Sequence, residues 1–286
     1  MPILIDYNQV ILASLFASIG NHHNVDIDEN LIRHMFLNSI RANRKKFNEE
    51  FGEIVICADG KNTWRREAYP YYKANRRKSR EESELDWNTL FTIMNNIRDE
   101  LKEFFPYKVI HMDHCEADDI IGTLVHEFGT ELNMGSEPFL ILSGDKDYIQ
   151  LQTYANVQQY DPIRKRWIKN QDPEGYLKEH IIKGDTGDGV PNILSADNCL
   201  AIGERQKMMT QKRMATYLGG EQNMDEETLR RFHRNKMMID LKEIPANYKE
   251  KILQEYNKEK EVGRQQLFNF FIQKKLKNLV SDIQDF

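Results

Sequence analysis

Cysteine is scarce in this chain of 286 residues, whose three cysteines stand far apart at Cys57, Cys115 and Cys199. An odd, scattered set excludes a disulfide framework and a cysteine-based zinc site, and it is typical of a reducing cytoplasm. Long apolar runs are also missing. The longest, residues 10–19, is too short to span a bilayer, and no basic residue precedes it as in an export signal. We therefore expect a cytoplasmic protein without a membrane partner, and we expect a monomer.

Several catalytic motifs are absent. The sequence has no G-x-x-x-x-G-K-[ST] phosphate loop, no G-x-G-x-x-G and no nucleophile elbow in a Ser-His-Asp order. Its eight histidines show no metal-ligand spacing, and Asn8 stands where an aspartyl phosphatase would need a second aspartate after Asp6. These absences exclude the common nucleotide-binding and serine-hydrolase mechanisms.

Charge is abundant but unevenly distributed. The chain has a net charge of −5, yet residues 61–80 hold eight Lys/Arg and one Glu, and residues 205–286 hold 17 basic and 12 acidic residues. In the first of these segments four aromatic residues alternate with the cations, namely Trp64, Tyr69, Tyr71 and Tyr72. Cations bind phosphates and aromatic faces stack on bases, so the mixture indicates contact with single-stranded nucleic acid rather than a merely solvated surface.

Short apolar runs and amphipathic stretches alternate in the first half of the chain. The apolar runs predict strands at residues 2–5, 54–58, 108–112 and 139–142. Helical spacing predicts helices at residues 10–19, 29–47, 87–104 and 118–132. Residues 157–160 and 166–169 could add a short edge hairpin. This alternation predicts an α/β domain over residues 1–170 with a mainly parallel central sheet flanked by helices, followed by a smaller helical part over residues 171–286.

Acidic residues follow the predicted strands at equivalent places. Seven of them are Asp6, Asp59, Glu116, Asp118, Asp119, Asp145 and Asp147, and a glycine-rich loop over residues 184–189 adds Asp185 and Asp188. Because the carboxyl ends of parallel strands border one crevice, we expect most of these side chains to converge.

Converging carboxylates repel one another unless protons or cations neutralise them. Oxygen ligands without thiolates or imidazoles favour a hard cation, Mg²⁺ with Mn²⁺ as a substitute, and two such ions are typical of phosphodiester cleavage. Any one acid alone could be a helix cap or a turn residue. Caps do not explain so many acids at strand ends, so we predict a two-metal site.

The acidic motifs together resemble a known family. Ile-Asp6, Ala-Asp59-Gly, Glu116-Ala-Asp118-Asp119, Ser-Gly-Asp145-Lys-Asp147 and Gly-Asp185-Thr-Gly-Asp188-Gly-Val-Pro are similar to the motifs of the 5′-nuclease family, the flap endonucleases and 5′→3′ exonucleases. The stretch from Trp64 to Trp87 and the layout of the whole chain are most similar to the ribonuclease H subgroup of T-even-like bacteriophages.

The resemblance implies a PIN-like core and a division of labour among the acids. The first metal would be held by Asp6, Asp59, Glu116, Asp118 and Asp145. The second would be served by Asp147, Asp185 and Asp188, with Asp145 near both ions and Asp119 as a further member. Asp118 and Asp145 would be catalytic, and water would attack the scissile phosphate in line.

The resemblance also implies the nucleic-acid contacts. Residues 61–82 would form a mobile helical segment over the active site, which we name the arch segment. From it the catalytic pair Arg65 and Lys73 would steady the phosphate, Tyr72 would stack on a nucleobase, and Arg66 and Arg76 would add phosphate contacts. A helix–three-turn–helix element over residues 181–215 would grip the duplex backbone through Lys183, Lys207, Lys212 and Arg213.

Two features depart from the simplest version of this pattern. The family commonly continues Asp-Asn-Ile-Pro-Gly-Val, whereas here Asp188 is followed by Gly189, which bears on duplex gripping and on a monovalent-ion site. Residues 265–272 mimic a sliding-clamp peptide, but their helical setting inside the domain favours a core helix.

These observations predict a Mg²⁺-dependent 5′→3′ exonuclease and flap endonuclease with ribonuclease H-type activity. It would act on DNA and RNA–DNA duplexes with 5′ ends, flaps or nicks during DNA replication, beside a single-strand-binding protein or a sliding clamp. A PIN-type ribonuclease and a non-cleaving DNA-junction binding protein are the alternatives. The basic arch segment and the Gly184–Pro191 loop argue against the first, and the complete acid set argues against the second.

Overall fold

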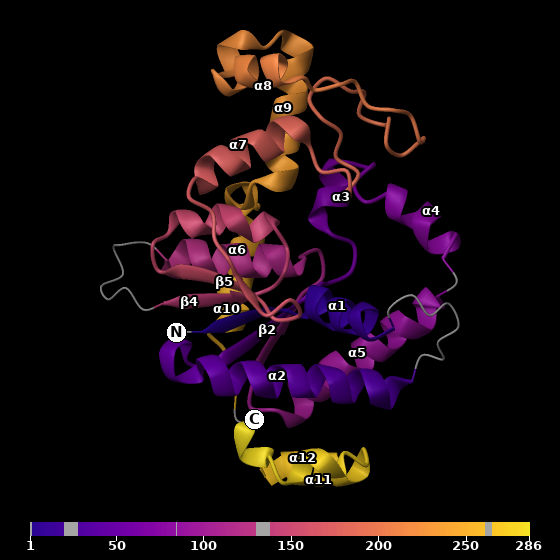
Figure 1. The fold of residues 1–286 in the computed structure, drawn as a ribbon, viewed down its shortest axis with the longest axis vertical. Coiled ribbons are helices and arrows are strands. Elements are labelled where there is room, and N and C mark those ends of the chain that lie inside the picture. Colours follow the sequence, from indigo (N-terminus) through magenta and orange to yellow (C-terminus); the bar gives the residue numbers. More distant parts are fainter. Residues whose placement is uncertain (1, 20–27, 84, 130–137, 261–264) are drawn as a thin grey trace.

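One mostly parallel sheet organises the molecule. The computed structural model describes residues 2–19, 28–83, 85–129, 138–260 and 265–286 (Figure 1). In the described part of the chain the sheet runs in the order β3-β2-β1-β4-β5-β6, and only β6 is antiparallel to its neighbour. The strands are β1 (Ile3–Asp6), β2 (Ile54–Ala58), β3 (Lys108–His111), β4 (Phe139–Leu142), β5 (Val157–Asp161) and β6 (Arg166–Ile168). The predicted parallel sheet and its edge hairpin are confirmed.

Of the four inner strands, β1, β2 and β4 are buried along their whole length, as expected of apolar strands covered on both faces. The chain passes from β1 to β2 on one side, whereas β4 joins β1 on the other. The strand order therefore reverses between β1 and β4. Ligands of open α/β sheets bind beyond the carboxyl ends of the strands at such a reversal.

One face of the sheet is covered by α1 (Tyr7–Ile19), α2 (Glu29–Phe51) and α5 (Trp87–Phe104). Helix α1 begins three residues before the predicted start because the Asp6 carboxylate accepts a hydrogen bond from the Gln9 backbone N–H at 3.1 Å and so caps it. Helix α2 continues one turn beyond the predicted end, because Phe51 is buried one turn after Phe47. The bounds of α5 agree with the prediction.

The opposite face is covered by α6 (Ala117–Phe128), α10 (Ala246–Tyr256), and the 3₁₀ segments η1 (Asp147–Thr153) and η3 (Leu241–Glu243). Gly122 lets η3 lie close to α6, since a Cβ at this position would stand 3.0 Å from the Leu241 Cβ. The predicted helix over residues 118–132 begins one residue early and ends at Phe128, and residues 130–132 lie outside the described part of the chain.

Helices stand beyond the carboxyl ends of the strands. These are α3 (Trp64–Ala68), α4 (Asn75–Glu81), α7 (Pro173–Lys183), α8 (Gln211–Leu218), η2 (Glu221–Asn223) and α9 (Glu226–Ile239). Helices α7 and α8 flank the loop 184–210 and share a small apolar cluster of Ile182, Ile193 and Met214. The helix–three-turn–helix element over residues 181–215 lies in this region and stays a prediction.

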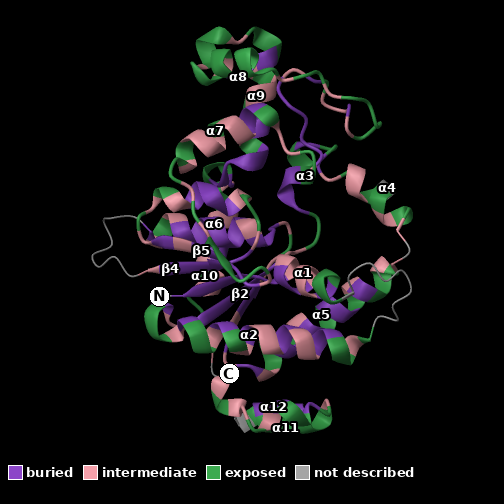
Figure 2. Cartoon of the chain, viewed as in Figure 1, coloured by how far each residue is buried: buried purple, intermediate pink, exposed green. Residues whose placement is uncertain are grey.

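The last residues return to the sheet. Helices α11 (Gln265–Gln273) and α12 (Lys277–Val280) with η4 (Ile283–Asp285) lie beside α2 and α5, at the end of the molecule opposite α8 (Figure 1). Within α11, Phe270 and Phe271 are buried, while Phe268 is 50% and Ile272 is 52% exposed. The expected core helix is thus confirmed for one face of this clamp-like peptide, and its other face is open (Figure 2). No described helix is both long enough and apolar enough to cross a membrane.

Candidate active site

Eight of the nine predicted acids line one open cavity of about 540 Å³ at the carboxyl ends of the strands. They are Asp6, Asp59, Glu116, Asp118, Asp145, Asp147, Asp185 and Asp188. Asp6 ends β1, Asp59 follows β2, Asp145 follows β4, and Glu116 precedes α6, so four elements aim their acids at the same space. The predicted convergence of these side chains is present.

Asp119 is the exception, because it lies behind the cavity and is fully buried. Its carboxylate accepts hydrogen bonds from the Trp64 indole at 3.1 Å and from the Glu116 backbone N–H at 2.8 Å. Asp119 therefore fixes the first turn of α6 and the position of α3, and it supports the neighbouring acids instead of lining the cavity.

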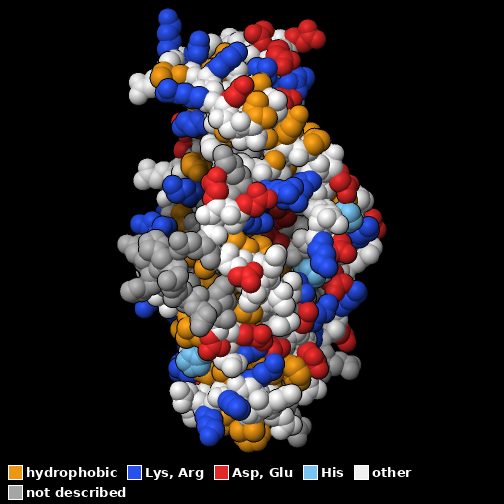
Figure 3. All heavy atoms as spheres, turned by 90° about the vertical axis from the view of Figure 1, so that its right-hand side faces the viewer, with side chains coloured by type: hydrophobic (Ala, Val, Ile, Leu, Met, Phe, Trp, Pro, Cys, Tyr) orange, Lys and Arg blue, Asp and Glu red, His pale blue; other side chains and the backbone are white. Residues whose placement is uncertain are grey.

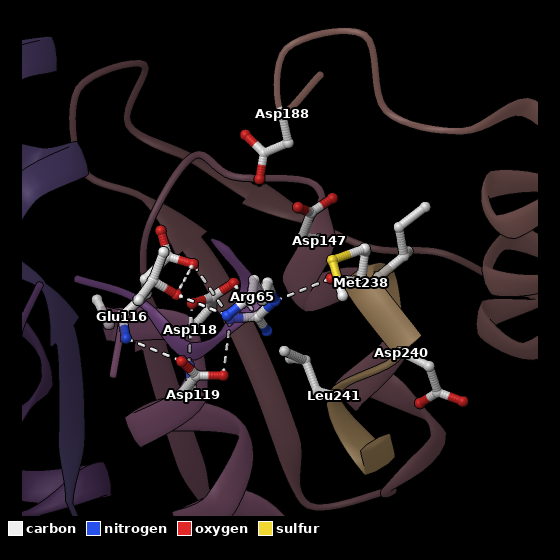
Figure 4. A network of polar contacts seen from close by, with 12 residues as sticks. Arg65, Glu116, Asp118, Asp119, Asp147, Asp188, Met238, Asp240 and Leu241 are labelled. Carbon is white, nitrogen blue, oxygen red and sulfur yellow. Dashed lines mark hydrogen bonds and ion pairs between the residues drawn. The ribbon is translucent and has the colours of Figure 1, made fainter. Parts of the chain in front are cut away.

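Arg65 is also placed differently from the expected arch contact. Its side chain is buried, with one guanidinium nitrogen 3.1 Å from Glu116 Oε2 and 2.8 Å from Asp119 Oδ1 (Figure 4). A second lies 3.6 Å from Asp118 Oδ2, and Nε donates to the Met238 carbonyl at 2.9 Å. In this arrangement Arg65 cannot reach a phosphate, and it holds three acids together from below.

The aromatic residues of the arch segment are mostly buried. Trp64, Tyr69 and Tyr72 are each at most 4% exposed, and only Tyr71 reaches solvent substantially. The Tyr72 hydroxyl lies 2.9 Å from Glu116 Oε2 and 2.8 Å from Asp188 Oδ2, so it joins two acids. The expectation that Tyr72 presents its ring to a nucleobase is not met in this structure, because its ring packs beneath the site.

Lys73 and Arg76 do face the acid cavity, as expected. Lys73 Nζ lies 2.6 Å from Glu116 Oε1 and 3.5 Å from Asp188 Oδ2, and Arg76 forms an ion pair with Asp188. Lys73 has a positive φ of 56°, and its backbone N–H donates to the Asp188 carbonyl at 2.7 Å. The turn between α3 and α4 is therefore tied to the Gly184–Pro191 loop, and both cations are held at the edge of the acids.

The second group of acids contains a residue that the sequence pattern did not single out, His180 of α7. Its Nδ1 lies 3.5 Å from Asp147 Oδ1 and its Nε2 lies 3.4 Å from Asp185 Oδ2. Backbone contacts organise the same group, because Asp145 accepts from the Asp147 N–H at 3.0 Å and Asp185 accepts from the Asp188 N–H at 3.1 Å. The position of His180 near the end of a helix that leads into Gly184–Pro191 is the signal that could have pointed to it.

Crowding shifts the pKa values of these acids. Burial, together with the charges of Asp59 and Asp145, raises the pKa of Asp6 to about 7. Burial and neighbouring acids also raise the pKa of Asp147 well above its ordinary value. Glu116 behaves in the opposite way: burial opposes its ionisation, but Lys73 and Arg65 outweigh burial and lower its pKa to about 2. Burial of Asp6 and Asp147 beside other acids is therefore not offset by nearby positive charge, whereas that of Glu116 is.

The donor set fits hard divalent cations. Carboxylate oxygens predominate, and such ligands suit Mg²⁺ or Mn²⁺. Two groups have ligand atoms that all lie within 4.8 Å of one another, namely Glu116 with Asp118 and Asp119, and Asp147 with His180 and Asp185. The raised pKa values of Asp6 and Asp147 indicate that cations would relieve an existing repulsion.

The other predicted nucleic-acid contacts lie on the surface. Arg66, Lys183, Lys207, Lys212 and Arg213 are exposed, with Lys183 paired to Glu179 at 2.6 Å. Figure 3 views the side of the molecule that carries α4 and α5, where Lys and Arg side chains flank acidic side chains near the middle. Positive charge around a negative centre suits a polyanion that must approach metal ions.

Other contacts of the acid cavity were also not predicted from sequence. The Tyr148 hydroxyl donates to Asp6 Oδ2 at 3.0 Å, and Phe16 and Phe91 form an apolar wall of the cavity. Tyr148 directly follows Asp147, but the two phenylalanines come from different helices, so no local pattern marks them.

Two family models together match almost all of this chain. The model of the 5′-3′ exonuclease N-terminal resolvase-like domain matches residues 2–181, and that of the T4 RNase H C-terminal part matches residues 172–286. The chain therefore belongs to the 5′-3′ exonuclease family and is an enzyme of the nuclease class.

Individual relatives agree with this assignment. Ribonuclease H of Enterobacteria phage T4 is 32% identical over 99% of this chain and 95% of its own length. DNA polymerase I of Geobacillus stearothermophilus is 28% identical over 75% of this chain but only 23% of its own length. The fold is similar to that of the T5 D15 protein co-crystallized with metal ions, with a TM-score of 0.58, 18% identity and coverage of 99% and 98% of the two chains. It is also similar to a T5 D15 flap endonuclease variant in a complex with DNA and metal ions, with a TM-score of 0.59, 17% identity and coverage of 90% and 99%.

Proposed function

We propose that this chain is a Mg²⁺-dependent 5′→3′ exonuclease and flap endonuclease with ribonuclease H-type activity. It removes RNA primers and 5′ flaps from nicked or branched duplexes during DNA replication, in the cytoplasm of the producing cell. Mn²⁺ substitutes for Mg²⁺. Replication proteins such as a single-strand-binding protein or a sliding clamp are its proposed partners.

One observation carries the proposal: eight carboxylates from strand ends, a helix start and a glycine-rich loop line a single cavity whose edge holds Lys73 and Arg76. Similarity to the T4 ribonuclease H over nearly the whole chain supports the RNA-directed part of the function. The T5 D15 flap endonuclease variant, which has a similar fold, is in a complex with DNA and metal ions, and this supports the substrate and cofactor class.

The proposed role of each residue follows from its position in or beneath the cavity. Asp6, Asp59, Glu116, Asp118 and Asp145 would hold one ion, and Asp147, Asp185 and Asp188 would hold the other. When bound, the two ions supply Lewis-acid stabilisation of the charge that develops on the scissile phosphate. Lys73 and Arg76 orient the phosphate by charge-assisted hydrogen bonds from the edge of the cavity. Arg65, Tyr72 and Asp119 hold the acids in place from beneath.

Gel analysis of labelled substrates tests the proposal. A 5′-labelled flap and a nicked RNA–DNA duplex are incubated with Mg²⁺ or with EDTA, and product lengths are measured. We expect short 5′ products only with Mg²⁺. Asp118→Asn and Asp145→Asn should abolish cleavage but retain substrate binding, since binding rests on the basic surfaces. Cleavage that persists in both variants, or in EDTA, would contradict the proposal.

The alternatives predict different outcomes of the same experiment. A PIN-type ribonuclease would cut single-stranded RNA and leave the DNA flap intact. A non-cleaving junction binder would retain the flap substrate with Mg²⁺ but yield no product. The complete set of cavity acids and the family match over residues 2–181 favour the 5′-nuclease.

A further inference from the structure

A second cavity of about 280 Å³ adjoins the acid cavity. Its lining comes from the loop before α3, from the arch segment, from α5 and from β3. The two cavities share seven lining residues, namely Asn8, Asp59, Lys73, Arg76, Arg80, Phe91 and Glu116, so the two spaces meet between two of the cavity acids and the basic residues of the arch segment. A substrate seated on the acids would therefore border this second space.

The charge of the second cavity is opposite to that of the first. Six basic side chains line it, against the two acids Asp59 and Glu116. The basic set is Lys61, Arg66, Lys73, Arg76, Arg80 and Arg98. These positive charges repel one another, as the carboxylates of the acid cavity do. A bound anion would reduce this repulsion.

Half of these cations already have partners. Lys73 and Arg76 pair with Glu116 and Asp188, and Arg98 pairs with Asp99 at 2.8 Å. Lys61, Arg66 and Arg80 form no ion pair with a carboxylate in the described part of the chain. Three cations at one cavity thus remain available to a ligand.

Arg80 is fixed in place by aromatic rings. Its guanidinium lies 4.9 Å from the centroid of the Phe91 ring and 5.4 Å from that of Trp87. Burial and the nearby guanidinium groups of Arg76 and Arg66 lower the pKa of Arg80. Arg80 is therefore a pre-positioned cation under repulsion, which an anion would relieve.

We propose that this cavity binds the 5′-terminal phosphate of the substrate through Arg66, Arg80 and Lys61. The inference rests on the proposed function, because it assumes that the scissile phosphate of the same substrate lies in the adjacent acid cavity. A terminal phosphomonoester carries about 1.5–2 negative charges at neutral pH, against one for an internal phosphodiester, so a cluster of unpaired cations favours the chain end. Arginine also matches phosphate with paired N–H donors.

An aromatic wall beside the cavities suits the adjoining base. Phe16 is 41% exposed, and its ring centroid lies 6.2 Å from that of Trp87, which in turn lies 5.7 Å from that of Phe91. Phe16 and Phe91 line the acid cavity, and Phe91 also lines the basic one. A terminal nucleotide with its phosphate on Arg80 would have this wall next to its base.

Binding without metal tests the proposal. Fluorescence anisotropy in EDTA measures the affinity for a nicked duplex that carries either a 5′-phosphate or a 5′-hydroxyl at the nick. We expect the native protein to bind the phosphorylated end about tenfold more tightly, as one or two charge-assisted hydrogen bonds would give. Arg80→Gln and Arg66→Gln should each reduce this ratio several-fold, because each variant loses more affinity for the phosphorylated end than for the hydroxyl end.

The control variant is Arg77→Gln, because Arg77 lies on the same helix but pairs with Glu81 at 2.9 Å and does not line the cavity. Its ratio should equal that of the native protein. Equal affinities of the native protein for the two ends would overturn the proposal. So would an equal loss for both ends in Arg80→Gln and Arg66→Gln, which would assign the cations to internal phosphates. Thermal melting verifies the fold of each variant, and exposed Arg66 provides a test if Arg80→Gln does not fold.

Competition with inorganic phosphate tests whether the cavity recognises the phosphate group itself and not the rest of the nucleic acid. Added at constant ionic strength, it should abolish the preference of the native protein for the phosphorylated end, and a preference that persists at saturating phosphate would overturn the proposal. Because no metal is present, the binding ratio is independent of cleavage. A failed cleavage assay would therefore count against the proposed function, whereas a missing phosphate preference would count against this cavity alone.

Discussion

Arg65 and Arg66 are neighbours in the sequence but face opposite environments. Arg65 is fully buried against Glu116, Asp118 and Asp119, whereas Arg66 is exposed. In the sequence, both residues contribute one positive charge to the basic segment, and nothing distinguishes their roles. The orientation of the short helix α3 alone makes one of them a support for the acids and the other a surface cation.

Removing the Arg65 side chain tests its supporting role. Arg65→Ala leaves buried carboxylates without their cation, so the free energy of unfolding without metal should fall by about 3–5 kcal/mol. Mg²⁺ should recover part of this loss, because it neutralises the same acids. Urea unfolding in EDTA and in Mg²⁺ measures both values. Arg66→Ala is the matched control and should change stability by less than about 0.5 kcal/mol. A similar loss in both variants would contradict the role assigned to Arg65.

The raised pKa of Asp6 leads to a prediction of how the stability of the folded protein depends on pH. Its pKa is raised from 3.8 to about 7, so between these values the folded protein binds more protons than the unfolded one. Stability without metal should therefore fall as the pH rises from about 4 to about 7, and the stabilisation by Mg²⁺ should grow over the same range. Thermal melting in EDTA and in Mg²⁺ at both ends of the range measures these trends.

The matched variant for this pH dependence is Asp6→Asn, which cannot titrate. Its slope of stability against pH should be smaller than that of the native protein, although Asp147, whose pKa is also raised, keeps the slope from vanishing. An unchanged slope in Asp6→Asn would remove Asp6 as a source of the effect.

At the scale of elements, the arch segment consists of two short helices and a turn that is bonded to the Gly184–Pro191 loop. The Lys73 N–H donates to the Asp188 carbonyl, and Asn75 Nδ2 donates to the Thr186 carbonyl at 2.7 Å. The sequence predicted a basic helical segment over the site. It did not predict the burial of Trp64, Tyr69 and Tyr72, because alternating aromatic and basic residues suit a binding surface and a packed turn equally well.

Lys73 is one of the direct contacts that the arch segment makes with the cavity acids, and its replacement should affect cleavage more than folding. Lys73→Ala should lower the single-turnover rate by about 10²–10³-fold, as the loss of one pre-positioned charge at a reacting phosphate does. Its thermal stability should remain close to that of the native protein. Arg77→Ala, on the exposed side of α4, should leave the rate unchanged. Equal rates in Lys73→Ala and the native protein would remove Lys73 from the mechanism.

The elements of the α/β part were predictable to within a few residues. The spacing of apolar residues gave α5 its bounds, and continuous apolar runs located β1, β2 and β4. The differences occur at ends that long-range packing decides, such as the extra turn of α2 that buries Phe51.

At the scale of the whole molecule, the C-terminal residues cover both faces of the sheet. Helix α10 lies on the α6 side, and α11 and α12 lie beside α2 and α5. The Phe270 ring lies 5.0 Å from that of Phe104 and 5.5 Å from that of Phe105. The predicted division near residue 170 remains a prediction about chain organisation, but the last helices pack into the same core as the sheet.

A pair of phenylalanines on α11 tests this packing. Phe270 is buried and Phe268 is half exposed, two residues apart on one helix. Phe270→Ala should lower the free energy of unfolding by about 3–5 kcal/mol, because it removes a ring from the core. Phe268→Ala should change it by less than about 0.5 kcal/mol. Urea unfolding compares the two, and equal losses would contradict the assignment of their faces.

The sequence by itself determined the kind of fold, the position of most of the acids after predicted strands and of two more in a glycine-rich loop and, through their joint pattern, the family. These follow from local rules, since apolar periodicity sets strands and helices and the carboxyl ends of parallel strands meet at one edge. Tertiary structure alone decided that Asp119 and Arg65 support the site from beneath, that His180 joins Asp147 and Asp185, and that Arg80 rests on Phe91 and Trp87. Those contacts join distant parts of the chain, or depend on which face of a short helix is buried, and no local pattern of residues encodes either.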